Sequence, residues 1–148
     1  MLAVCLHGVA AAEEDPSSAV RWSWQLEPVN AAPGTEADLV LVAQIAPGWV
    51  VYSSDFKVEI GPQPARLVAA AESRQDLLGP LRSIDARRKR GTALDVEYGY
   101  FSGRAELRQR VRVPPAGSAL VATLRGQACH ETDGTCHLLR QPVRVAAL

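Results

Sequence analysis

Apolar and polar residues alternate along most of the chain after residue 19, which is the period expected of strands that bury one face. In the stretch VRWSWQLEPV, for example, Val20, Trp22, Trp24 and Leu26 fall on one side. Clusters of Gly, Pro and Ser separate such segments. The pattern predicts about eight short strands, the number and spacing of a β-sandwich, at residues 20–29, 37–45, 48–54, 65–71, 92–101, 104–113, 118–129 and 141–147.

This pattern favours an all-β fold, a single antiparallel β-sandwich domain. Residues 69–79 (AAAESRQDLLG) form the one segment that could be a helix, and it is short. The basic run RRKR at residues 87–90 is expected to be a solvated loop. Charged and apolar residues alternate over residues 103–113, so the arginines there should form a solvated sheet face. The tryptophans are expected to be core or rim aromatics, at Trp22, Trp24 and Trp49.

Length and charge narrow the function classes. The chain has 148 residues, 16 basic and 16 acidic, and 47% of its residues are hydrophobic. One domain of this length can bury a core without a metal or a disulfide. Its balanced charge provides no excess of positive charge that would attract nucleic acid or an anionic membrane, so no nucleic-acid partner is expected. Ser-His-Asp catalysis is also disfavoured, because both histidines beyond the first residues stand beside cysteines.

The first residues have the character of a leader. An apolar stretch ends in three alanines, Ala10 to Ala12, before acidic residues begin at Glu13, as at a signal peptidase site. We therefore expect residues 1–12 to be a signal-peptide remnant and residues 13–148 to be the folded domain of an exported protein. Cys5 would leave with the leader, so that two cysteines remain to form a disulfide in an oxidising compartment.

The remaining cysteines lie in ACHETDGTCHLL, residues 128–139. Cys129 ends one predicted strand and Cys136 precedes the last, so the residues between them should form a hairpin tip with a turn at Asp133-Gly134. Cysteines facing each other across a hairpin mouth can approach the separation that a disulfide requires. Such a short ring stabilises a fold by only about 2.5 kcal/mol.

The spacing alone leaves three interpretations of this loop open: a structural staple, a redox dithiol, or a zinc or copper site. His130 and His137 could favour a thiolate when protonated, whereas Glu131 and Asp133 would oppose it. The metal interpretation is the least favoured, because neighbouring residues on a strand point to opposite faces. No metal or other cofactor is therefore expected.

The order of motifs resembles a known family. The segments APGWVVYSSDF, GPQPARL, YFSGRAELRQRVRV and LRGQACHETDGTCHLLRQPVRV follow one another as in the N-terminal periplasmic domain of the DsbD-type thiol:disulfide interchange proteins. The resemblance covers residues 20–147. The chain differs from the family pattern at two places. It has one additional residue between the cysteines, and it has His137-Leu138-Leu139 where an aromatic-proline pair usually follows the second cysteine.

The resemblance implies an immunoglobulin-like sandwich and a protein-disulfide reductase component. It implies that Cys136 attacks client disulfides and that Cys129 resolves the mixed disulfide. From their position beside the cysteines, His130 and His137 are candidates for tuning the thiols. Partners would be periplasmic thioredoxin-fold proteins, as clients and donor, and a membrane electron-transfer protein acting in trans on a monomer. Residues shielding the pair would be Tyr52, Asp95, Tyr98 and Tyr100. The alternative is a noncatalytic immunoglobulin-like binding or structural module with a staple disulfide.

Overall fold

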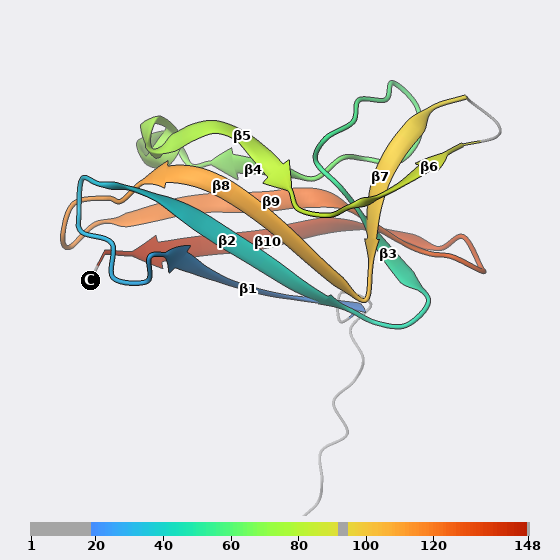
Figure 1. Ribbon diagram of the computed structural model, residues 1–148, viewed down its shortest axis with the longest axis horizontal. Helices are drawn as coiled ribbons and strands as arrows, with labels where there is room; N and C mark the ends of the chain where they lie inside the picture. Colours follow the sequence, from blue (N-terminus) through green and yellow to red (C-terminus); the bar gives the residue numbers. More distant parts are fainter. Residues whose placement is uncertain (1–18, 92–94, 148) are drawn as a thin grey trace, which may run out of the picture.

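The computed structural model describes residues 19–91 and 95–147, which form two antiparallel sheets packed face to face (Figure 1). The predicted all-β sandwich is confirmed. The expected leader, with Cys5, lies outside the described residues. In chain order the strands and the 3-10 helix η2 are β1 (Val20–Glu27), β2 (Glu36–Ile45), β3 (Trp49–Tyr52), β4 (Arg66–Ala69), η2 (Ala71–Asp76), β5 (Leu77–Ser83), β6 (Arg87–Arg90), β7 (Glu97–Ser102), β8 (Arg104–Arg112), β9 (Ala119–His130) and β10 (Cys136–Ala146).

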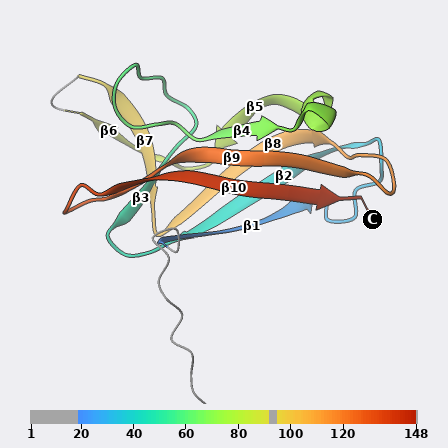
Figure 2. The ribbon, with the colours of Figure 1, turned by 180° about the vertical axis from the view of Figure 1, so that it is seen from behind.

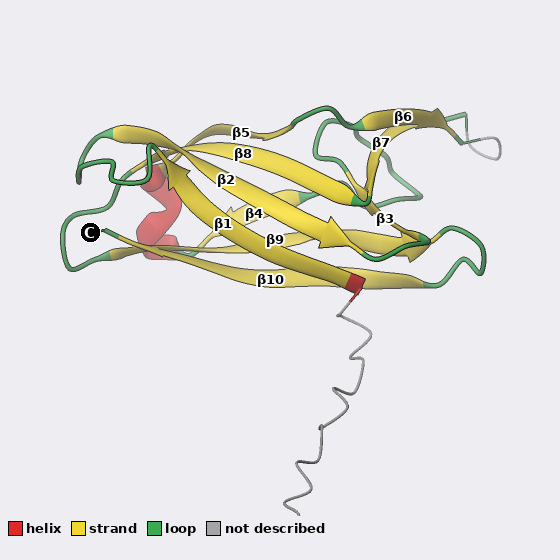
Figure 3. Cartoon of the chain, turned by 60° about the horizontal axis from the view of Figure 1, so that its bottom comes forward, coloured by secondary structure: helices red, strands yellow, loops and turns green. Residues whose placement is uncertain are grey.

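The two sheets differ in size and in what they carry. One sheet has the strand order β1-β2-β8-β5, and the other has the order β10-β9-β3-β7-β6, with β4 also pairing with β9. The long β9–β10 hairpin runs the length of the sandwich (Figures 1 and 2). Its tip and the β6–β7 hairpin lie at the end of the molecule opposite η2 (Figure 3). No helix among the described residues is long and apolar enough to span a membrane.

Alternation along the strands builds the core between the sheets. In β8, Ala105, Leu107 and Val111 are fully buried, whereas the arginines between them face outward. The largest buried side chains come from both sheets, so burial of these apolar groups holds the layers together. They are Leu39, Leu41, Leu107, Leu120, Leu124, Val51, Val111, Val113 and Val143.

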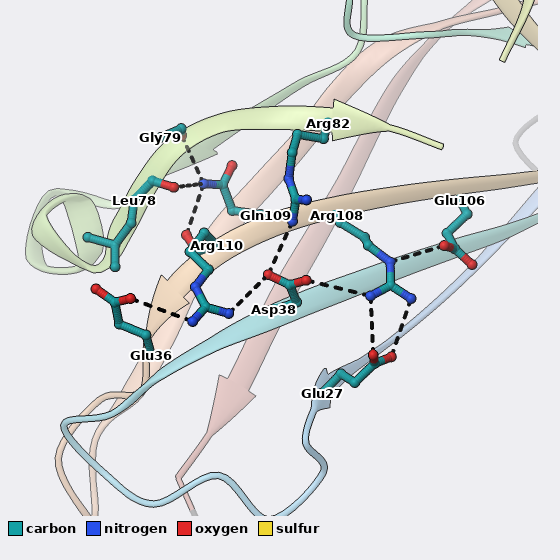
Figure 4. Close-up of polar contacts among 10 residues, drawn as sticks. All are labelled: Glu27, Glu36, Asp38, Leu78, Gly79, Arg82, Glu106, Arg108, Gln109 and Arg110. Carbon is teal, nitrogen blue, oxygen red and sulfur yellow. Dashed lines mark hydrogen bonds and ion pairs between the residues drawn. The ribbon is translucent and has the colours of Figure 1, made fainter. Parts of the chain in front are cut away.

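Gln109 is a buried polar exception in β8, and its amide nitrogen is hydrogen-bonded. Its Nε2 donates to the carbonyl oxygens of Leu78 at 3.2 Å, Gly79 at 3.0 Å and Arg110 at 3.1 Å (Figure 4). The pairing of β5 with β8 shifts register between Leu78 and Arg82, directly beside these carbonyls. Gln109 therefore adds side-chain hydrogen bonds between β8 and β5 at the irregular part of their pairing.

The outer face of the β1-β2-β8-β5 sheet carries arginines, as predicted, and carboxylates stand among them (Figure 4). Asp38 lies 3.2 Å from Arg82 and 3.4 Å from Arg110. Partial burial opposes ionisation of Asp38, but hydrogen bonds and charge from Arg82 and then Arg110 outweigh it and lower the pKa of this carboxyl. A hydrogen bond from Arg108 likewise lowers the pKa of Glu106. This face is thus a network of paired charges.

Three expectations about the elements were wrong. The basic run at residues 87–90 is exposed, but it is strand β6 rather than a loop, because β7 supplies its backbone partners. Residues 69–79 do contain a short helix, the six-residue 3-10 helix η2, but β5 begins at Leu77, and β5 and β6 raise the strand total above the predicted eight. The last strand begins at Cys136 rather than at residue 141, because its first residues pair with β9.

Candidate active site

The two cysteines form a disulfide at the tip of the β9–β10 hairpin. Cys129 and Cys136 stand directly opposite each other in register, with their Cα atoms 4.1 Å apart and their sulfurs 2.09 Å apart. Cys129 is buried, with 8% of its surface exposed, whereas Cys136 is exposed. The bridge therefore presents one accessible sulfur and one covered sulfur.

The turn between the cysteines is held by local hydrogen bonds. The N–H of His130 donates to the carbonyl of Thr135 at 2.7 Å, and the N–H of Thr135 donates to the carboxylate of Asp133 at 2.8 Å. This backbone hydrogen bond is the main reason that the pKa of Asp133 lies below its usual value. Gly134 has a φ of +71°, a left-handed conformation that glycine adopts without strain, as expected for the predicted Asp133-Gly134 turn.

An aromatic cluster covers Cys129. Tyr52 of β3 packs against Cys129, and Phe56, Tyr98 and Tyr100 complete the cluster. The ring centroids of Tyr52 and Tyr98 are 5.5 Å apart, and those of Tyr98 and Tyr100 are 6.4 Å apart. Burial, and secondly the phenol of Tyr98, raise the pKa of Tyr52. Tyr52 therefore stays a neutral phenol beside the disulfide at neutral pH.

A hollow of about 280 Å³ lies over the disulfide, and both cysteines and the three tyrosines line it. Its polar lining comes from Lys89 on β6 and from His130 and Glu131 at the end of the β9–β10 hairpin. Lys89 and Phe56 belong to this site although neither was among the residues predicted from the sequence. The sequence did contain a signal for Lys89, because the basic run at residues 87–90 comes shortly before a tyrosine-rich strand. Since the run was expected to be a loop, its position beside the cysteines could not be predicted.

Both histidines of the loop contact Trp49, which stands opposite His130 in the β3–β9 register. The His130 ring lies edge-on to the Trp49 ring, with the ring centroids 5.3 Å apart, and the His137 ring stacks on the Trp49 ring with the centroids 5.2 Å apart. Nδ1 of His130 also lies 3.0 Å from the Thr132 hydroxyl. Trp49 is a rim aromatic, as expected, but its role as the common support of two imidazoles was not foreseen. Within residues 19–91 and 95–147, no three His, Cys, Asp or Glu side chains form a group that could hold a metal ion.

Two predicted site residues do not line the hollow over the disulfide: His137, which lines a different hollow beside Val20 and Trp22, and Asp95. Asp95 precedes β7 with a φ of +51°, and its side chain is 84% exposed. Its carboxylate lies 2.7 Å from Nη1 of Arg90 on β6, and it does not line the hollow. Asp95 therefore joins the two strands of the β6–β7 hairpin from its outer end.

Neither a protein-family model nor a curated protein matches this sequence. Among solved structures, the N-terminal domain of DsbD from Neisseria meningitidis, in its reduced form, superimposes with a TM-score of 0.59 over 89% of this chain and 88% of that chain, at 16% sequence identity. The chain has the fold of the DsbD N-terminal domain. This is an immunoglobulin-like β-sandwich, so the predicted fold class and the predicted likeness are both confirmed.

A second structural neighbour is the N-terminal periplasmic domain of ScsB from Proteus mirabilis. It superimposes with a TM-score of 0.54 over 86% of this chain, at 12% identity. The chain spans 45% of that ScsB structure. Both likenesses concern the fold, so the chemistry has to be argued from the disulfide and its surroundings.

Proposed function

We propose that this domain performs thiol:disulfide exchange through Cys129 and Cys136, passing reducing equivalents to client proteins. The observation that carries the proposal is the asymmetric disulfide at the hairpin tip. Cys136 is exposed to a client, while Cys129 is buried under aromatic rings. A reactive disulfide needs one accessible sulfur and a partner close enough to resolve the mixed disulfide.

In the proposed reaction the reduced domain meets an oxidised client. The thiolate of Cys136 attacks one client sulfur, which forms a mixed disulfide and releases the other client sulfur as a thiolate. The thiolate of Cys129 then attacks the sulfur of Cys136, which restores the domain disulfide and releases the second client thiolate. The client gains two electrons and, after protonation of its thiolates, two protons, and the domain loses the same number.

The surrounding residues have supporting roles in this proposal. The rings of Tyr52, Tyr98 and Tyr100 cover Cys129 and so limit attack by other thiols on its sulfur. Asp95 fixes Arg90 and thereby the hairpin that carries two of these rings. His130, where protonated, adds positive charge beside the hollow and favours the thiolate over the thiol. His137 contacts the ring of Trp49, which also contacts His130, so His137 affects the thiols only indirectly, by helping to position Trp49 and His130.

The partners and the compartment follow from the same proposal. A thioredoxin-like protein, supplied with electrons by a membrane protein in trans, would reduce the domain. Thioredoxin-fold proteins would be its clients, and the periplasm its location. The fold shared with DsbD and with a periplasmic domain of ScsB supports this placement.

Trapping tests the proposal and the two cysteine roles. Reduced Cys129→Ala is incubated with an oxidised thioredoxin-fold protein and analysed on non-reducing gels and by mass spectrometry. It should accumulate a mixed disulfide through Cys136, whereas Cys136→Ala and the double variant should not. Equal trapping by both single variants would remove the assigned roles, and trapping by Cys136→Ala alone would reverse them. A reduction potential well below about −300 mV would instead identify an inert staple.

A further inference from the structure

Strand β6 carries four consecutive exposed cations, Arg87 to Arg90, at the outer edge of its sheet (Figure 1). Because side chains of a strand alternate between faces, these cations fall into two sets. Arg88 forms an ion pair with Asp55, and Arg90 forms one with Asp95. Arg87 and Lys89 form no ion pair within the described part of the chain. The strand therefore has one face of neutralised cations and one face of free cations.

The paired face of β6 is fixed by the chain around it. Arg88 stands opposite Gly99 of β7. A Cβ at Gly99 would lie 2.1 Å from the hydroxyl oxygen of Ser53 and 3.1 Å from Nη1 of Arg88. Ser53 in turn donates a hydrogen bond to Asp55, the partner of Arg88. The absence of a side chain at Gly99 thus makes room for a network that holds Arg88 on this face.

The free face of β6 is the one beside the disulfide. Lys89 stands opposite Tyr98, and Arg87 stands opposite Tyr100. Both tyrosines line the hollow over Cys136, and Lys89 lines it as well. Glu131 is the one carboxylate among the described lining residues, and it stands on the far side of the hollow, beyond β9. The β6 side of the reactive surface consequently has two uncompensated positive charges.

We infer that the protein partner that docks over this disulfide presents acidic side chains beside its own reactive cysteines. The inference rests on the proposed thiol:disulfide exchange and adds the chemistry of the partner. An approaching carboxylate meets Arg87 and Lys89 without having to displace an existing ion pair. A partner with cations at the same place is repelled, so the two charges select between partners and raise the association rate of acidic ones.

Charged peptides test this selection directly. Three synthetic dithiol peptides share a Cys-Ala-Ala-Cys centre and are flanked by glutamates, glutamines or lysines. One peptide thiolate attacks the sulfur of Cys136 in the oxidised domain and releases the thiolate of Cys129. The second peptide thiolate attacks the peptide sulfur of that mixed disulfide, so the peptide leaves oxidised and the domain is reduced. The second-order rate is measured for each peptide at low and high salt.

The glutamate peptide should react faster than the lysine peptide by on the order of tenfold at low ionic strength, the lower end of electrostatic steering effects. The difference should shrink in about 1 M salt, where charges are screened beyond about 3 Å. The variant Arg87→Glu/Lys89→Glu should reverse the order of the two peptides. The control Arg112→Glu/Arg144→Glu makes the same change in net charge away from the hollow and should preserve it. Each peptide has its own thiol pKa, so the glutamate-to-lysine rate ratio is compared between the unmodified protein, the β6 variant and the control, which cancels that difference.

The outcomes separate this inference from the proposed function. Equal rates for the glutamate and lysine peptides, a preference for lysine, or an order that the β6 variant leaves unchanged would each overturn the acidic-partner inference while exchange itself stands. If the glutamine peptide exchanges with the domain in neither direction, with the reduced peptide and oxidised domain or with the oxidised peptide and reduced domain, the proposed exchange is wrong, and the inference fails with it.

Discussion

Removing the disulfide should weaken the domain without unfolding it. The ring joins Cys129 and Cys136 over a sequence separation of 7. For so short a ring, the loss of chain entropy on closure stabilises the fold by about 2.5 kcal/mol. Cys129 belongs to a small cluster with Val50 and Tyr52, apart from the main core between the sheets. Removing its buried sulfur, which leaves only the methyl side chain of alanine, adds about 1 kcal/mol. Domains of this size have about 5 to 15 kcal/mol of stability, so Cys129→Ala/Cys136→Ala should remain folded.

The same free energy has a redox counterpart. The disulfide stabilises the folded state, so folding stabilises the disulfide by the same free energy. The disulfide of the folded domain should therefore be harder to reduce than the same ring in the unfolded chain. A coupling of about 2.5 kcal/mol corresponds to about 50 mV for a two-electron couple. The comparison is between the domain and a peptide of residues 128–137, each equilibrated with a glutathione buffer.

Urea unfolding followed by tryptophan fluorescence measures the stability difference. The oxidised protein, the reduced protein and the double variant are compared, and the reductant should leave the midpoint of the double variant unchanged. The single variant Cys136→Ala, which loses an exposed side chain, should match the reduced protein. A loss well above about 4 kcal/mol, or a reduced protein with no cooperative transition, would refute the reasoning and make the bridge a structural requirement.

Two further predictions concern the sheets. Gly99→Ala should destabilise the protein by about 1 to 3 kcal/mol, because the new Cβ would overlap the Ser53 hydroxyl. In the control Gly91→Ala the new Cβ meets only ordinary contacts, so the loss of stability should be below about 1 kcal/mol. The midpoints of urea unfolding measure both changes. Asp38→Asn should cost about 1 kcal/mol at pH 7. The pKa of Asp38 in the folded protein lies below its usual value of 3.8, so the stability that its carboxylate provides is complete above pH 3.8 and is lost as pH falls through the folded pKa. The free energies of unfolding of the two proteins should therefore converge in acid. A difference between them that does not change with pH would contradict this.

The sequence predicted those parts of the fold that one-sided burial controls. Strands β1, β2 and β8 each bury alternate residues, and this is what the period-two pattern reports. Strand β6 could not be found in this way, because all four of its side chains are exposed and its stability comes from the backbone of β7. Strand β5 was missed because its register shift, compensated by Gln109, breaks the alternation.

The candidate site was predictable where chain neighbours form it and not where distant strands meet. The hairpin, its turn and the facing cysteines follow from residues 128–139 alone. The support of His130 and His137 by Trp49 required the β3–β9 register, and the presence of Lys89 required a strand in place of a loop. Asp95 was placed by likeness to the family, but its ion pair with Arg90 keeps it at the outer end of the hairpin.

The register of the β9–β10 hairpin has a kinetic consequence. Pairing continues without interruption from Cys136 and Cys129 to Ala146 and Ala119, and Val143 anchors it in the core. Backbone hydrogen bonds, not the bridge, keep the two sulfurs opposite each other. After the bridge opens, each thiol should therefore remain at a very high effective concentration toward the other. In the proposed exchange, covalent complexes with clients should therefore be brief in the unmodified protein, and turnover should be limited by encounter and departure of the partner.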